Sequence, residues 1–242
     1  MSVFLKTPPR GRFALQGLLV LGLAWLAGCA PLAEAVGGLG PAGEALRYAL
    51  KPAAAPDGAR LPPGFEYIQV GVGSRQALMV LGQRRAAGAA DGPAQGVEEF
   101  WYSAQSELLH LRDGRLWRVL GMTTEWRKQY RKPPAWEDLP TNGEALTWAR
   151  RVDRMPGYRW ADQEQISTRR LLSVPTDQAG RAAVHGWPQA QWFEDVVQAT
   201  DAEGRPWHHT QRFALWQGQV VYSEQCIARD LCLTLTRLGR TK

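Results

Sequence analysis

The chain has little cysteine, little histidine and no long run of one charge. Three cysteines and four histidines occur in 242 residues, and no five or six like charges stand together. Cys226 and Cys232 have five residues between them and no histidine nearby, which is not a zinc spacing. Binding to nucleic acid needs clustered Lys and Arg. The sequence therefore predicts no metal, no cofactor and no nucleic-acid partner.

Long apolar stretches are also scarce, and the one present lies just before a cysteine. Phe13–Ala27 follows the basic residues Lys6, Arg10 and Arg12 and ends in Leu26-Ala27-Gly28-Cys29. This order is typical of a bacterial lipoprotein signal peptide. No second stretch approaches the ~18 apolar residues that a membrane span needs. We predict that the mature protein begins at Cys29, whose thiol receives diacylglycerol and holds the chain to a membrane by lipid alone.

Cleavage before Cys29 changes both the length and the charge. Without residues 1–28 the 242-residue chain keeps 214 residues, and its net charge falls from +6 to +3 because three basic residues are lost. That length fits one domain. Residues 29–63 are rich in Ala, Gly and Pro and are predicted to be a tether. Residues 64–242 are predicted to form a single β-rich domain.

Cys226 and Cys232 remain in a compartment that permits disulfides. The short segment between them fits a hairpin turn that would set the two residues in neighbouring strands. Two interpretations stay open at this point: a disulfide, or two buried free thiols.

From Pro63 onward, apolar and polar residues alternate in short runs that turn residues separate. The clearest hairpin joins Leu108–Leu111 to Arg115–Leu120 across Asp113-Gly114. Roughly ten such runs follow one another with almost no helical periodicity. We predict mostly β-structure: an antiparallel meander that forms a curved sheet, a sandwich or a half-open barrel, with few short helices.

The common catalytic signatures are missing. The chain has no Gly-x-Ser-x-Gly elbow, and Gly71-Val-Gly73 lacks the third glycine of a dinucleotide loop. Neighbouring carboxylates are more often solvated charge than a glycosidase pair; they occur at Glu98/Glu99, Asp162/Glu164 and Glu194/Asp195. His208 and His209 would point to opposite faces of a strand and could not share an ion. We expect no catalytic residue and no enzymatic activity.

Tryptophan is abundant, with 11 residues, and most indoles are expected in the core. Trp126 and Trp136 are the best candidates for exposed positions, because they lie in a charged, proline-rich segment. With the cations beside them they are predicted to form a surface for a glycan or a partner protein; its members are Trp126, Arg127, Lys128, Arg131, Lys132 and Trp136. A solvated loop is the alternative interpretation.

The order of several short motifs along the domain resembles a known family. They follow the Cys29 motif and its tether, and in chain order they are Tyr67–Val72, Ala77–Leu81, Leu111–Gly121, Trp148–Arg150 and Phe213–Gln225. This order resembles the YjbF/GfcB type of outer-membrane lipoproteins, which are encoded with machinery for extracellular polysaccharide and group 4 capsule. The resemblance implies an antiparallel β-fold without established catalytic residues. Cys226 and Cys232 are not part of its pattern.

The resemblance and the residue after Cys29 give an expected function. Ala30 is not the Asp that retains lipoproteins in the inner membrane of enterobacteria, so we expect the outer membrane, facing the periplasm. There the protein would act without catalysis in exopolysaccharide or capsule production or export, by binding polysaccharide or polysaccharide-export proteins. Two alternatives stay open: a glycan-active periplasmic hydrolase, and an envelope-assembly or stress protein that binds partners through sheet edges.

Overall fold

Twelve strands make up nearly all the regular structure of the described residues. The computed structural model describes residues 61–88, 96–130, 133–177, 187, 189–201 and 203–238; the predicted signal peptide, Cys29 and most of the predicted tether lie outside them. No helix within these ranges has the length and apolarity that crossing a membrane requires. The elements are β1 (Tyr67–Val72), β2 (Arg75–Ala86), β3 (Val97–Ser103), β4 (Leu108–Arg112), β5 (Arg115–Leu120), β6 (Glu125–Tyr130), the 3-10 turn η3 (Trp136–Asp138), β7 (Leu146–Met155), β8 (Arg159–Arg170), β9 (Gln191–Thr200), β10 (Pro206–Trp216), β11 (Gln219–Ala228) and β12 (Leu231–Arg237).

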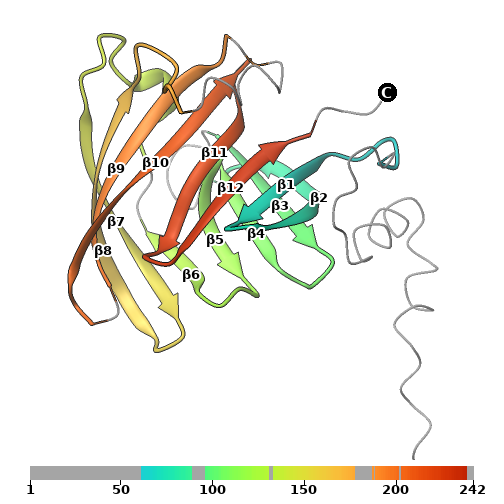
Figure 1. Ribbon diagram of the computed structural model, residues 1–242, viewed down its shortest axis with the longest axis horizontal. Helices are drawn as coiled ribbons and strands as arrows, with labels where there is room; N and C mark the ends of the chain where they lie inside the picture. The colour runs from blue at the N-terminus through green and yellow to red at the C-terminus, as the bar shows by residue number, and fades with distance from the viewer. Residues whose placement is uncertain are drawn as a thin grey trace, which may run out of the picture. The chain divides into compact units, whose positions relative to one another are not determined.

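The strands form an antiparallel meander that closes into a barrel. Each strand pairs with its neighbours in sequence, and β1 pairs with β12 from Ile68↔Arg237 to Val72↔Leu233. The red β12 lies directly beside the blue-green β1 (Figure 1). The predicted antiparallel β-meander is confirmed, and the sheet curls completely. Closure pairs the backbone groups that two free edge strands would leave open.

Alternating residues fill the barrel, as the period of a strand requires. Leu231, Leu233 and Leu235 on β12 are 8 %, 0 % and 5 % exposed, and they join one apolar cluster with residues of β1 to β7. Trp101 and Leu109 belong to that cluster, and each is 0 % exposed. Burial of these side chains supplies the main driving force for closing the barrel on this side.

Alternating turns divide the loops between two ends of the barrel. We call the end where β1 begins and β12 finishes the entry end; the β4–β5 and β10–β11 turns and η3 lie there as well. The other end, with the β1–β2, β3–β4, β5–β6 and β11–β12 turns, is the far end. Strands β2, β3 and β12 run between the two ends and contribute residues to a cavity at each.

The sequence interpretation missed one strand. The sequence predicts no strand over Glu125–Tyr130, which belongs to the charged segment around Trp126, but it forms β6 and pairs with β7 from Glu125↔Met155 to Tyr130↔Arg151. Toward β5 it has a single paired position, Val119↔Trp126. Trp126 points inward, but its neighbours in the sequence are charged or polar. This short strand therefore shows no clear alternation of apolar and polar residues.

Candidate functional site

A polar cavity of about 380 Å³ opens at the entry end of the barrel. Its walls come from β2, β3 and β12, from the β4–β5 and β10–β11 turns, and from η3. Small-molecule sites in proteins occupy roughly 300–1,000 Å³ and often lie in the mouths of β-barrels. We call this space the polar cavity.

Four charged side chains compensate one another along one wall. Glu99 is 4 % exposed, and its carboxylate accepts hydrogen bonds from Arg84 Nε (2.9 Å), from Trp101 Nε1 (3.3 Å) and from Arg237. Arg84 Nη1 donates to Glu66 at 2.8 Å, and Arg237 Nη1 lies 3.6 Å from a Glu66 oxygen. The hydrogen bond to Glu66 raises the pKa of Arg84, whereas burial lowers that of Arg237. Both guanidiniums stay charged, and each is paired as a buried charge must be.

Two glycines allow the turns around the cavity to approach closely. Gly96 has φ +103°, and a Cβ there would lie 2.2 Å from Asp113 Oδ2. Gly114 has φ +78°, and a Cβ there would lie 2.3 Å from Val220. The Asp113 carboxylate accepts a hydrogen bond from the Val97 amide at 2.7 Å. These contacts fix the β4–β5 turn against β3 and β11, so that the cavity wall is preformed.

Trp136 separates the polar cavity from the barrel interior. Its Nε1 donates to the Asp113 carbonyl at 2.9 Å, and the Arg115 guanidinium lies 3.3 Å from its ring centroid. Phe193 and Phe213 pack against the same ring at centroid distances of 4.8 and 5.0 Å. The indole is only 5 % exposed, so the prediction of an exposed Trp136 is wrong. The residue still lines the cavity, as part of its wall rather than as a stacking platform.

Below Trp136 the interior continues as a network of ion pairs. Arg115 Nε lies 3.4 Å from Asp195, which also accepts a hydrogen bond from Thr168 Oγ1 at 2.6 Å. Burial lowers the pKa of Arg115, and the Asp195 carboxylate opposes that effect. Because Arg115 is held by Asp195, its guanidinium supports the Trp136 ring from a fixed position.

A second buried group surrounds Glu164. Arg150 Nε donates to Glu164 at 2.5 Å, and Arg154 donates both to Glu164 and, at 2.9 Å, to Asp162. Burial alone would raise the pKa of Glu164, but the two guanidiniums outweigh it and hold the pKa below its usual value. Glu164 is therefore ionised at neutral pH, without the proton that a general acid donates.

The predicted surface around Trp126 is not assembled. Trp126 is 1 % exposed, and its ring lies 4.5 Å from the Arg150 guanidinium inside the barrel, so the prediction of an exposed position is wrong. Arg127 is exposed and pairs with Glu125 at 2.7 Å. Lys128 belongs to β6, opposite Asp153 in register. Arg131 and Lys132 lie outside the described residues. Trp126 points inward because β6 is a strand whose inner face is the barrel interior.

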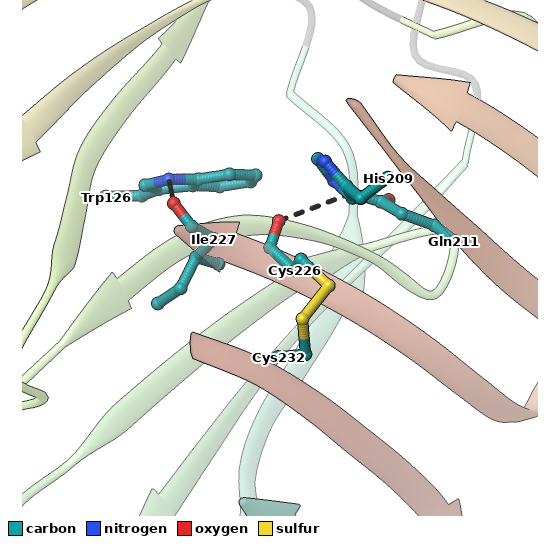
Figure 2. Close-up of a disulfide and its surroundings, with 6 residues drawn as sticks. All are labelled: Trp126, His209, Gln211, Cys226, Ile227 and Cys232. Atoms are coloured by element: carbon teal, nitrogen blue, oxygen red, sulfur yellow. Dashed lines mark hydrogen bonds between the residues drawn. A yellow bond between two sulfur atoms is a disulfide. The ribbon is translucent and has the colours of Figure 1, made fainter. Parts of the chain in front are cut away.

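Cys226 and Cys232 form a disulfide that links β11 to β12 at directly paired positions. A β-bulge between Cys226 and Ala228 interrupts the ladder there, and such bulges leave backbone groups unpaired. Figure 2 shows what the freed carbonyls bind: Trp126 Nε1 donates to the Ile227 carbonyl at 3.0 Å, and Gln211 donates to the Cys226 carbonyl at 3.4 Å. Arg154 Nε also donates to the Ile227 carbonyl, at 3.4 Å, so the bridged hairpin receives hydrogen bonds from three interior side chains.

The other predicted carboxylate pairs also bind arginines. Glu98 and Glu99 are adjacent on β3 but bind Arg85 and Arg84 respectively, at 2.8 and 2.9 Å. Within the described ranges no three His, Cys, Asp or Glu side chains cluster as metal ligands do. What the polar cavity offers chemically is a fixed set of hydrogen-bonding groups.

Sequence reasoning missed most of the cavity. Glu66, Arg84, Glu99 and Arg237 span nearly the whole domain, so no local spacing connects them. The available signal was the pairing of β1 with β12, which brings the first and last strands together. Of the lining residues, the sequence pointed to Trp136 as a surface candidate, to Glu99 as half of a carboxylate pair and to Asp113-Gly114 as a turn, but it did not bring them together.

Comparison with known proteins places the fold. No protein-family model matches the chain, and no curated protein matches it. The crystal structure of the hypothetical lipoprotein YmcC from Escherichia coli K12 is similar, with a TM-score of 0.52 over 74 % of this chain and 86 % of that one. The two sequences are 12 % identical. The chain therefore shares its fold with a protein described as a lipoprotein.

Proposed function

We propose that this chain is a lipid-anchored outer-membrane protein of the periplasm that takes part in exopolysaccharide or capsule production or export. It acts by binding, without catalysis, and the polar cavity receives a segment of the polysaccharide. The anchor is Cys29, after a signal peptide of residues 1–28. Support comes from the Leu26-Ala27-Gly28-Cys29 motif, from the YjbF/GfcB-like order of motifs, and from the fold shared with a hypothetical lipoprotein.

The binding role rests on a difference between two groups of side chains in the polar cavity: one group already has partners, and the other does not. Arg84, Arg237 and Glu99 already compensate one another, so they give the wall its shape and polarity. Glu137 and Gln219 also line the cavity, and their side chains have no partner among the described residues. A carboxylate and an amide free to bond are the groups that recognise sugar hydroxyls. The cavity therefore favours a hydroxyl-rich, uncharged segment of polymer.

The test of this role is a deletion strain complemented with variants of the full chain. Deleting the gene should lower the amount of secreted polysaccharide, and the wild-type gene should restore it. Gln219→Trp fills the polar cavity from an exposed turn and should fail to restore secretion although the protein accumulates normally. Gln165→Trp makes the same change at an exposed position of β8 and should restore it. Unchanged secretion in the deletion strain would contradict the proposal.

Membrane fractionation tests the proposed localisation separately. Separated inner and outer membranes should show the wild-type chain in the outer membrane, and Cys29→Ser should remove it from there. Recovery of the wild-type protein in the inner membrane would contradict the proposed localisation.

A further inference from the structure

A second cavity, of about 500 Å³, lies at the far end of the barrel and differs from the first in its lining. We call it the apolar cavity. Its deep wall is formed by Val70, Met79 and Leu231, which belong to the main apolar cluster, and Met122 from the β5–β6 turn packs against them. Methionine side chains are flexible and polarisable, so they adapt to an apolar occupant. The space is thus an extension of the core that side chains do not fill.

Two charged side chains, Arg75 and Glu107, line the mouth of this cavity. Arg75, Ala77 and Met79 alternate along β2 and so share the inner face of the strand, with Met79 deepest and Arg75 at the turn. Arg75 is exposed, and it has no ion-pair partner among the described residues. Glu107, also at the mouth, is bonded to the Ser103 hydroxyl. The Glu107 carboxylate keeps its charge but is held by that hydroxyl, so the group at the mouth whose donors no described residue occupies is the Arg75 guanidinium.

We infer that the apolar cavity binds the aliphatic chain of an anionic amphiphile, with its carboxylate or phosphate on Arg75. Guanidinium is the side-chain group best matched to those anions. At about 30 Å³ for a water-sized group, 500 Å³ holds about 16 such groups, which is the length of one fatty-acyl chain. The site is separate from the polar cavity, and it does not depend on the proposed function.

Photolabelling of the full chain in membranes tests this site. Two palmitate probes are used, one with a diazirine beside the carboxylate and one with it at the chain end. The first should label Arg75 or Gln76 at the mouth, and the second should label Met79 or Leu231 in the deep wall, as read by mass spectrometry. Equal labelling of both depths by both probes would overturn the inference.

Two variants separate the chain from the head group. Ala77→Trp fills the cavity and should lower deep-wall labelling at least tenfold, whereas Gln165→Trp on β8 should leave it unchanged. Arg75→Glu alters only an exposed side chain, so it keeps the fold, and should lower labelling by both probes at least fivefold. Full labelling of Arg75→Glu would overturn the role of the anion.

A photoactivatable phosphatidylglycerol, which is a net anion, distinguishes the source of the ligand. Deep-wall labelling by this probe but not by palmitate assigns the site to a phospholipid, and the reverse assigns it to a free fatty acid. An acyl chain attached to Cys29 carries no anionic head, and contact with it would not respond to Arg75→Glu. Absence of deep-wall labelling by every probe would overturn the inference.

Discussion

The polar cavity and the apolar cavity lie at opposite ends of β2, β3 and β12, and their linings differ. At the entry end, β2, β3 and β12 contribute Arg84, Glu99 and Arg237, which together with Glu66 form a balanced set of charges. At the far end the same strands contribute Met79, Ser103 and Leu231, and the mouth carries Arg75, a cation with no ion-pair partner among the described residues. The difference shows that one sheet can present a hydrogen-bonding wall at one end and a hydrophobic wall at the other. The position of a residue along its strand decides which end of the barrel it reaches.

Substitutions at the two cavities should lower the free energy of unfolding by different amounts. The largest loss is expected at Glu99. Glu99→Gln removes the charge that pairs two guanidiniums, at a site only 4 % exposed. Breaking a buried pair costs roughly 3–5 kcal/mol, and about 3 kcal/mol is expected because Arg84 is partly exposed. Urea unfolding measures it.

The neighbouring carboxylate is the matched control. Glu98→Gln affects a pair with Arg85, whose side chain is 53 % exposed, and should cost about 1 kcal/mol or less. Equal losses for the two variants would contradict the compensating role of Glu99.

A smaller loss is expected at the apolar cavity. Met79→Ala removes core atoms, but these border a space that already exists, so the cost should fall at the low end of the usual range, about 2 kcal/mol. Urea unfolding with an unchanged slope is the measurement. A loss equal to or above that of Glu99→Gln would reverse the comparison.

The disulfide stabilises the far end. Reduction of Cys226–Cys232 should lower the free energy of unfolding by about 2 kcal/mol, since the closed loop is short. Secretion of polysaccharide should persist in Cys226→Ser/Cys232→Ser, because the bridged hairpin turns away from the polar cavity. An unfolding midpoint that does not respond to reductant would contradict this role.

Acid should destabilise the barrel without acting on either cavity. Burial lowers the pKa of His209 to about 4; Glu164 opposes this, and Arg150 and Arg154 reinforce it. The unfolded chain takes up that proton near pH 6.5, so the free energy of unfolding should fall as the pH drops from about 6.5 towards about 4. Burial lowers the pKa of His110 to about 4 in the same sense.

Unfolding at pH 7, 5.5 and 4.5 measures this effect. His209→Gln should reduce the pH dependence by about half and leave the part that His110 contributes, whereas His208→Gln, at the exposed neighbouring position, should leave it as it is. A wild-type stability that rises on acidification would contradict the buried, neutral state of His209.

Local patterns predicted the strands well where one face is apolar. The predicted strand Arg115–Leu120 has the bounds of β5, and the predicted strand Leu108–Leu111 lies within β4. β6 could not be read, because a six-residue strand with one inward tryptophan has no visible period. Closure of the barrel could not be predicted from the sequence either, because it depends on the pairing of β1 with β12 across the whole domain.

The two cavities also depend on the pairing of the first strand with the last. Glu99 meets Arg237 only because the last strand returns to the first, and no spacing along the chain records that contact. The charged segment around Trp126 suggested a surface, yet it supplies an interior side chain, since charges outside a strand do not reveal what its inner face contacts. The disulfide was one of two open interpretations, and register settles it.

Binding of polysaccharide at the polar cavity is the central claim, and co-sedimentation tests it most directly. Membranes that carry the full chain are mixed with polysaccharide from the organism that encodes it, and the pelleted polysaccharide is measured. Wild type and Ala77→Trp should retain the polymer equally, and Gln219→Trp should retain at least tenfold less. Equal retention by Gln219→Trp, or none by the wild type, would contradict the claim.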